Sequence, residues 1–290
     1  MKKTAVIIIL MLSMPLLAKD SNRTEDIINN ILSETPEKQS VKPPAGDLKK
    51  PEGDKKPDEK PQPEKKTAPK KDSPVVSNAE EVLLKTGIQF YNSGLYPHSM
   101  KNFRELVDKY PQSPHRDSAR VWIGKILIKQ YNYDEAIKEF SSVPDGSGEY
   151  PLALFMMAES NMLKRDYISA IEYYQRVFSR FPEHELADNA LLNMGRLYLN
   201  TQKGTQALDA TTKLIKYYKN RETIPDAYYL LGRIFEKDPT LKDYETARKV
   251  YKLFIKKAES GVEPFSKSPL TKRVKADLLY LEKRHFKQEN

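Results

Sequence analysis

Small and aromatic residues recur at a fixed spacing in the last two thirds of the chain. A small residue is followed twelve positions later by another small residue and sixteen positions later by a larger one. Five such sets follow one another: Gly87, Ser99 and Phe103; Gly124, Ala136 and Phe140; Ala158, Ala170 and Tyr174; Gly195, Ala207 and Thr211; and Gly232, Ala247 and Tyr251. The last set contains three extra residues near 238–241, and the leading small residues are 37, 34, 37 and 37 positions apart. Repetition at this period is typical of a helical solenoid.

The apolar periodicity around each set predicts two helices rather than strands. The expected pairs are 79–93 with 97–109, 115–130 with 133–143, 150–164 with 167–180, 185–201 with 204–219, and 223–237 with 243–260. Ser268 and Pro269 have the residue types of an N-cap and a first helical position, which predicts one more helix. Its apolar stripe would be Leu270, Val274, Leu278 and Leu281. We therefore expect an all-α fold without a β-sheet.

This pattern resembles the tetratricopeptide repeat (TPR), a 34-residue unit of two antiparallel helices. Pro111 and Pro182 stand where the family pattern ends the second helix, whereas Ser99, Thr211 and the 37-residue spacings depart from it. The resemblance implies a right-handed solenoid of about five helix pairs over residues 79–266. A capping helix over 267–288 would cover the last apolar face, as a solenoid requires.

The first 18 residues have the order of a secretory signal peptide. Lys2 and Lys3 precede an apolar run that ends at Leu17, and Ala18 is suited to cleavage. The run is shorter than the roughly 20 residues that span a bilayer. Leu16 stands where a small residue is usual, so an uncleaved anchor is the competing interpretation. Either interpretation predicts export from the cytoplasm.

Two different segments precede the repeats. Within residues 19–35, the stretch TEDIINNILSE from Thr24 to Glu34 predicts a short amphipathic helix, with disorder as the alternative. Residues 36–78 predict a disordered linker, because positions 36–74 hold nine Pro, eleven Lys and eight acidic residues. Such a chain favours extended polyproline II, at about 3.1 Å per residue.

The amino-acid composition excludes several classes of function. The chain of 290 residues has no Cys, which excludes disulfides, thiolate metal sites, cysteine nucleophiles and a lipidated N-terminal Cys. Its four His form no metal-binding motif, and Lys203-Gly204-Thr205 lacks the earlier Gly of a phosphate-binding loop. We therefore expect no enzyme, no metal and no cofactor. From residue 79 onward, 34 Lys and Arg face 28 Asp and Glu, a modest formal charge of +6, and an exported protein rarely meets nucleic acid, so nucleic-acid binding is not expected.

The TPR resemblance implies that the first helix of each pair lines a concave groove. The residues that it places there, which are our candidate partner-binding site, are Asn92, Lys125, Lys129, Phe155, Asn193, Arg196, Asn200, Arg233 and Lys237. Ile88, Tyr91, Glu159, Met156, Met162 and Leu163 would border the same groove. Asn bonds both backbone donors and acceptors, and Lys and Arg favour carboxylates. For each charged residue, an ordinary solvated surface position is the alternative; Trp122 is interpreted as a packing residue.

These observations predict an exported, non-enzymatic scaffold of the bacterial periplasm or cell envelope. Its partner would be another envelope protein or an extended peptide segment. The order of signal peptide, spacer and repeats resembles the periplasmic repeat proteins of the Tol-Pal system. The number of repeats resembles the TPR subunit of the outer-membrane β-barrel assembly machine. The alternative is a wall-associated structural module whose linker contacts peptidoglycan. Contact with a membrane is expected only if the signal segment stays uncleaved.

Overall fold

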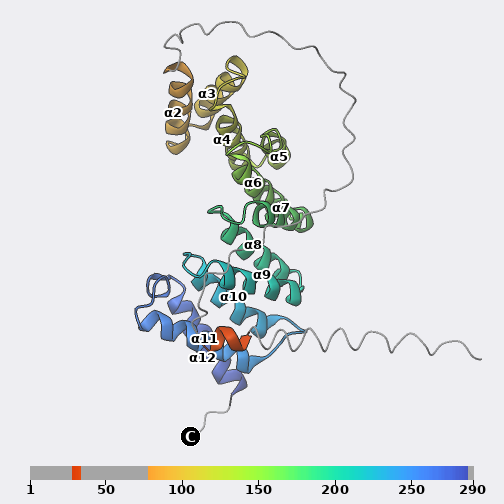
Figure 1. Cartoon of the computed structure of the whole chain (residues 1–290), viewed down its shortest axis with the longest axis vertical. Coiled ribbons are helices and arrows are strands. Elements are labelled where there is room, and N and C mark those ends of the chain that lie inside the picture. The colour runs from red at the N-terminus through yellow and green to blue at the C-terminus, as the bar shows by residue number, and fades with distance from the viewer. Residues whose placement is uncertain (1–27, 34–77, 287–290) are drawn as a thin grey trace, which may run out of the picture. The chain divides into compact units, whose positions relative to one another are not determined.

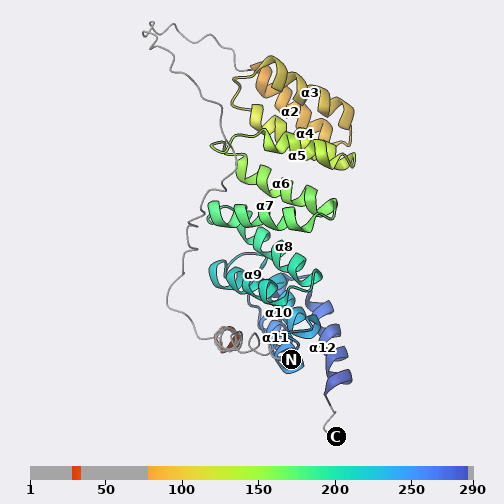
Figure 2. The same ribbon diagram turned by 90° about the vertical axis from the view of Figure 1, so that its right-hand side faces the viewer.

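The computed structural model describes residues 28–33 and 78–286, and this part of the chain is helical without any β-strand (Figures 1 and 2). Five helix pairs follow one another: α2 (Asn78–Asn92) with α3 (Tyr96–Lys109), α4 (Arg116–Lys129) with α5 (Tyr133–Ser141), α6 (Tyr150–Leu163) with α7 (Tyr167–Arg180), α8 (Ala187–Asn200) with α9 (Gly204–Tyr217), and α10 (Ile224–Lys237) with α11 (Tyr244–Glu259). A 3₁₀ turn, η1 (Phe265–Lys267), and α12 (Thr271–His285) complete the fold. The predicted all-α repeat architecture is confirmed.

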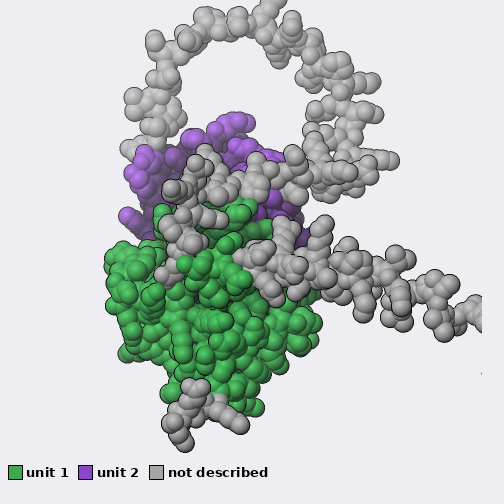
Figure 3. Space-filling model, turned by 60° about the horizontal axis from the view of Figure 1, so that its bottom comes forward, with its two compact units in different colours: residues 1–43, 191–290 green, residues 44–190 purple. Residues whose placement is uncertain are grey.

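The chain divides into two compact units, which Figure 3 colours separately. We call residues 44–190 the N-terminal unit. The C-terminal unit combines residues 1–43 with residues 191–290. Each unit is described by itself below.

Within a pair, the two helices meet where a small residue of the first helix faces a large side chain of the second. A Cβ atom added to Gly87 would lie 2.5 Å from the ring of Phe103, too close for any real contact. The same clash would arise between Gly124 and Phe140 and between Gly232 and Tyr251. The facing rings of Phe103, Phe140, Tyr174 and Tyr251 are fully buried. The recurring set of residues in the sequence is therefore a recurring contact.

Two departures from the family pattern are accommodated without unsatisfied polar groups. Ser99 is fully buried, and its hydroxyl donates a hydrogen bond to the carbonyl of Gly87 at 2.8 Å. Thr211 is also buried, and its hydroxyl donates to the carbonyl of Ala207 at 2.7 Å. Because Thr211 is smaller than an aromatic ring, Leu230 of the next pair reaches Gly195 instead, 2.9 Å from where a Cβ would stand.

The turn inside each of the first four pairs has the same geometry. A residue with positive φ stands two positions after the end of the first helix, and the next amide donates back to the carbonyl five residues earlier, as in a Schellman motif. The positive-φ residues are Gly94, Tyr131, Arg165 and Gln202. Only the first is Gly, so the packing of the pair determines this turn more strongly than local propensity does.

The three-residue insertion in the fifth pair is organised by Asp238. Its side chain is buried, and Oδ1 accepts hydrogen bonds from the amides of Thr240 and Leu241 at 2.9 and 3.1 Å. The carboxyl group lies against Gly204, where a Cβ would overlap it. The glycine of the Lys203-Gly204-Thr205 sequence therefore serves this close approach.

The C-terminal helix packs on α11 through the predicted apolar stripe, in which Val274 and Leu281 are buried. The predicted start of this helix at Ser268 was wrong, because α12 begins at Thr271. Ser268 instead forms a turn in which its hydroxyl oxygen accepts a hydrogen bond from the amide of Leu270 at 3.2 Å.

Residues 28–32 are helical, which agrees with part of the amphipathic helix that we predict for Thr24–Glu34. Ile28 is buried, Ile31 and Leu32 are half-buried, and Asn29 and Asn30 are exposed. The predicted signal segment, residues 1–18, and the predicted linker, residues 36–78, lie outside the described residues except for Asn78. Within the described ranges, none of the helices has both the length and the apolar character that crossing a membrane demands.

Because small and aromatic residues are in close contact, replacing Gly124 should affect stability much more than replacing Gly146. Gly124→Val would force Phe140 out of its position and should lower the free energy of unfolding by about 1 to 3 kcal/mol. Gly146 has open space around it, so Gly146→Val should change stability by less than about 0.5 kcal/mol. Urea denaturation followed by circular dichroism measures both. Equal effects would show that close helix approach is not what the glycine provides.

Candidate functional site

An open pocket of about 330 Å³ lies on the first helices of the first three pairs. We call it the aromatic–lysine pocket. It is lined by Tyr91 of α2, by Trp122, Lys125, Ile128 and Lys129 of α4, and by Met156 of α6. Its volume is at the lower end of the range for ligand pockets and suits one or two side chains.

The helical period of α4 builds one wall of this pocket. Trp122, Lys125 and Lys129 are three and four residues apart, so they share one face of the helix. The opposite faces of α4 are buried through Ile123, Ile126 and Leu127. The apolar core therefore orients α4 and directs the Trp and Lys side chains into the groove.

Trp122 is held by two aromatic neighbours from the first pair. The ring of Tyr91 meets it edge-on with centroids 4.9 Å apart, and Phe103 stacks on it at 6.1 Å with an interplanar angle of 13°. Phe103 is the buried ring that faces Gly87. The packing of the first pair thus also positions the indole in the pocket.

Lys125 places its charge over this indole. Its ammonium nitrogen lies 4.2 Å from the ring centroid of Trp122, a cation–π geometry. Burial lowers the pKa of Lys125, while the carboxylate of Glu149 acts in the opposite direction. The ammonium is therefore partly dehydrated, which strengthens its attraction to an incoming carboxylate.

The structure brings some of the predicted site residues of the N-terminal unit together. Lys125 and Lys129 line the same pocket, and Asn92 is exposed at the end of α2, next to Tyr91. Phe155 is half-buried and packs edge-on against Tyr174 with centroids 5.3 Å apart. Trp122 and Ile128 are pocket residues that the sequence analysis missed. The spacing of Trp122 from Lys125 and Lys129 was the available signal.

In the C-terminal unit, the predicted cations already have partners. Arg196 forms an ion pair with Asp226 of the next pair at 2.5 Å, and Lys237 pairs with Glu236 at 2.6 Å. Asn200 is exposed and Asn193 is half-buried. These residues occupy the first helices of their pairs, as predicted, and their role in binding stays a prediction.

Arg233 belongs to a polar network that reaches the capping helix. Its guanidinium donates to the hydroxyl of Tyr229 at 3.0 Å, and this hydroxyl donates to Asp277 of α12 at 2.7 Å. Arg273 donates to the same carboxylate at 3.1 Å. Further along the same face of α10, Glu236 accepts from the hydroxyl of Tyr251 at 2.8 Å, and burial raises the pKa of that phenol. The capping helix therefore supplies a carboxylate that accepts directly from Tyr229 and Arg273, and Tyr229 links it to Arg233.

The geometry defines an α-helical repeat protein whose first helices carry a surface pocket. Residues 152–184, 189–221 and 226–259 each match the family model of the tetratricopeptide repeat. These three segments are tetratricopeptide repeats, and the α2/α3 and α4/α5 pairs before them show the same kind of contact between a small and an aromatic residue. This class of scaffold is suited to binding other proteins. The resemblance to Tol-Pal and barrel-assembly proteins stays a prediction.

Solved structures agree with this fold. The crystal structure of MamA protein is 16% identical, with a TM-score of 0.51 over 62% of this chain and 94% of that one. A tetratricopeptide repeat protein from Parabacteroides merdae ATCC 43184 is 17% identical, with a TM-score of 0.54 over 71% of this chain and 74% of that one. Identities this low show the fold alone. A search of curated proteins finds no match.

The single Trp of the chain allows the electrostatics of the pocket to be measured directly. Because Lys125 and Lys129 lie beside Trp122, we expect iodide to quench its fluorescence roughly two to three times more strongly than caesium. Lys125→Glu with Lys129→Glu should reverse this order. Lys138→Glu with Lys101→Glu, on exposed positions of second helices, should leave it unchanged. If iodide still quenched Trp122 more strongly than caesium in the Lys125→Glu, Lys129→Glu variant, the assignment would be contradicted.

Proposed function

We propose that this protein is an exported, non-enzymatic adaptor of the cell envelope. It holds an extended segment of another envelope protein, and the aromatic–lysine pocket is the anchor point. The observation that carries the proposal is the pocket itself, in which an indole and two lysines from α4 meet side chains of α2 and α6.

The chemistry of the pocket indicates the kind of segment that it binds. Trp122, Tyr91, Ile128 and Met156 offer apolar and aromatic surface, which suits an aromatic or long aliphatic side chain. Lys125 and Lys129 favour a carboxylate beside that side chain. The preferred ligand is therefore an extended peptide with an acidic residue next to a large apolar one. Met156 is adaptable in shape, so several apolar side chains would be accepted.

The envelope location is supported by the sequence at the N-terminus. A basic start, an apolar run and Ala18 are the features of an export signal. The Pro- and Lys-rich positions 36–74 would then separate the site of attachment from the repeats. Binding to peptidoglycan through this linker is the alternative function, and it rests on sequence composition alone.

Photocrosslinking in intact cells tests the adaptor proposal. A photoreactive amino acid at Lys129, which is exposed and lines the pocket, should give one dominant adduct with an envelope protein. The matched control is Lys138, which is also exposed but lies on the second helix of the same pair. Mass spectrometry identifies the adduct. Trp122→Ala should reduce the yield of this adduct at least about tenfold, because the substitution removes a well-packed aromatic anchor.

Two results would contradict the proposal. One is the same adducts from positions 129 and 138, which would indicate non-specific collisions. The other is an adduct at position 129 whose yield is unchanged by Trp122→Ala. Loss of cell-wall sedimentation after deletion of residues 36–74, without any adduct at position 129, would favour the peptidoglycan alternative.

A further inference from the structure

A second surface lies on α11 in the C-terminal unit, and it belongs to a different unit from the aromatic–lysine pocket. Lys249, Lys252, Leu253 and Lys256 recur at intervals of three and four residues, so they form one face of the helix. We call them the α11 lysine face. They line an open pocket of about 430 Å³, and the fifth lining residue is Leu32 from the N-terminal part of the chain.

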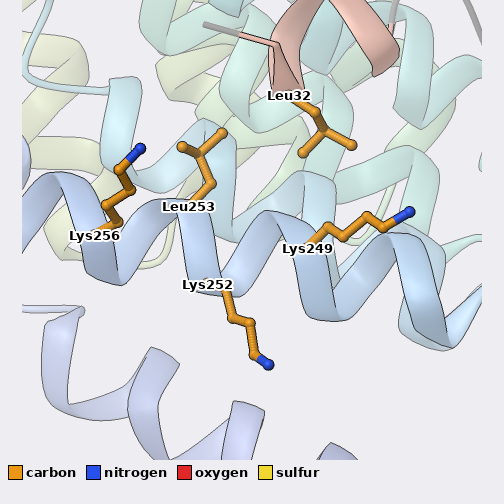
Figure 4. A pocket seen from close by; sticks show the side chains of 5 residues that line it. All are labelled: Leu32, Lys249, Lys252, Leu253 and Lys256. Atoms are coloured by element: carbon orange, nitrogen blue, oxygen red, sulfur yellow. The ribbon is translucent and has the colours of Figure 1, made fainter.

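Figure 4 shows how these side chains lie. Leu32 projects from its short helix towards α11, above Leu253 and Lys249. Lys249 and Lys256 extend on either side along α11, while Lys252 points away. The ammonium of Lys252 is 2.9 Å from Glu282 of the capping helix. An apolar side chain thus sits on an apolar spot that is flanked by lysines.

The short helix at residues 28–32 has an apolar face that matches the apolar spot on α11. Ile28 is only 6% exposed, whereas Asn29 and Asn30 are exposed. A helix of this length is marginal in water by itself, so burial of Ile28 implies a stabilising contact with the rest of its unit. The side chains that the period of a helix places together, Ile28, Ile31 and Leu32, are the ones that lose exposure.

The charges of the two elements are complementary. The stretch from Thr24 to Glu34 contains Glu25, Asp26 and Glu34 and no Lys or Arg, which gives it a formal charge of −3. Lys249 and Lys256 contribute two positive charges on either side of Leu253, whereas the charge of Lys252 is paired with Glu282 (Figure 4). Complementary charge specifies the partner and the orientation of such a contact more than its affinity.

We propose that the α11 lysine face is a docking site for an acidic amphipathic helix, and that its occupant is residues 24–34 of the same chain. Because both elements belong to one molecule, docking benefits from a high effective concentration and needs little intrinsic affinity. Docking would fold the N-terminal segment back onto the last repeat pair. It would also keep the face covered until a stronger acidic helix displaces it.

Disulfide trapping in the full chain tests this docking, because the chain has no Cys of its own. The test variant is Leu32→Cys with Lys249→Cys, which retains Ile28 and Ile31. The matched control is Asn30→Cys with Lys249→Cys, since Asn30 lies on the exposed side of the short helix. Under mild oxidation, the test pair should close within the monomer at least about tenfold faster than the control pair, at a rate independent of protein concentration.

Further substitutions in the test variant check which face of the short helix docks and whether the lysines of α11 contribute. Ile28→Asp should slow closure to the control rate, whereas Asn29→Asp should leave it unchanged. Lys256→Glu should slow closure as well, without altering the circular dichroism of the solenoid. Equal rates for the test and control pairs would overturn the proposal. Disulfides found only in dimers would also overturn it, because the occupant would then be a second copy of the chain.

Discussion

The close approach of the two helices in each pair is the constraint on which the rest of this structure depends. In the first, second and fifth pairs it exists because Gly87, Gly124 and Gly232 leave room for the rings of Phe103, Phe140 and Tyr251. The turns inside the first four pairs adopt a positive-φ residue even where that residue is Tyr131 or Arg165. Stacking of further pairs then buries the remaining apolar faces, as in other solenoids.

The same contact connects the fold to the candidate site. Phe103 fills the space beside Gly87 and also stacks on Trp122, so one ring both closes the first pair and positions the indole of the pocket. Lys125 lies over that indole because the period of α4 places it there. The core of the N-terminal unit thus presents a preorganised aromatic surface with partly dehydrated positive charge. Preorganisation of this kind lowers the entropic cost of binding an extended segment.

The repeat architecture could be predicted from the sequence because its period is carried by residues close together in the chain. The pocket was harder to predict. A Trp at helical spacing resembles a core residue, and whether Trp122 borders a pocket depends on Tyr91 and Met156, which lie about thirty residues away on either side. The ion pair of Arg196 with Asp226 and the contact of Asp277 with Tyr229 depend in the same way on how separate helices meet. The start of α12 was misplaced because Ser268 forms a turn that resembles a helix cap.

The two proposed surfaces differ in what they recognise. We propose that the aromatic–lysine pocket accepts an extended segment from another molecule, and that the α11 lysine face accepts a helix of this chain. The central claim is that the first of these is a specific site. Selection of binders from a random peptide display library, with the full chain and its Trp122→Ala variant as parallel targets, tests it most directly. We expect enriched sequences in which an acidic residue adjoins a large apolar one, and loss of that enrichment with Trp122→Ala. The same enriched sequences on both targets would contradict it.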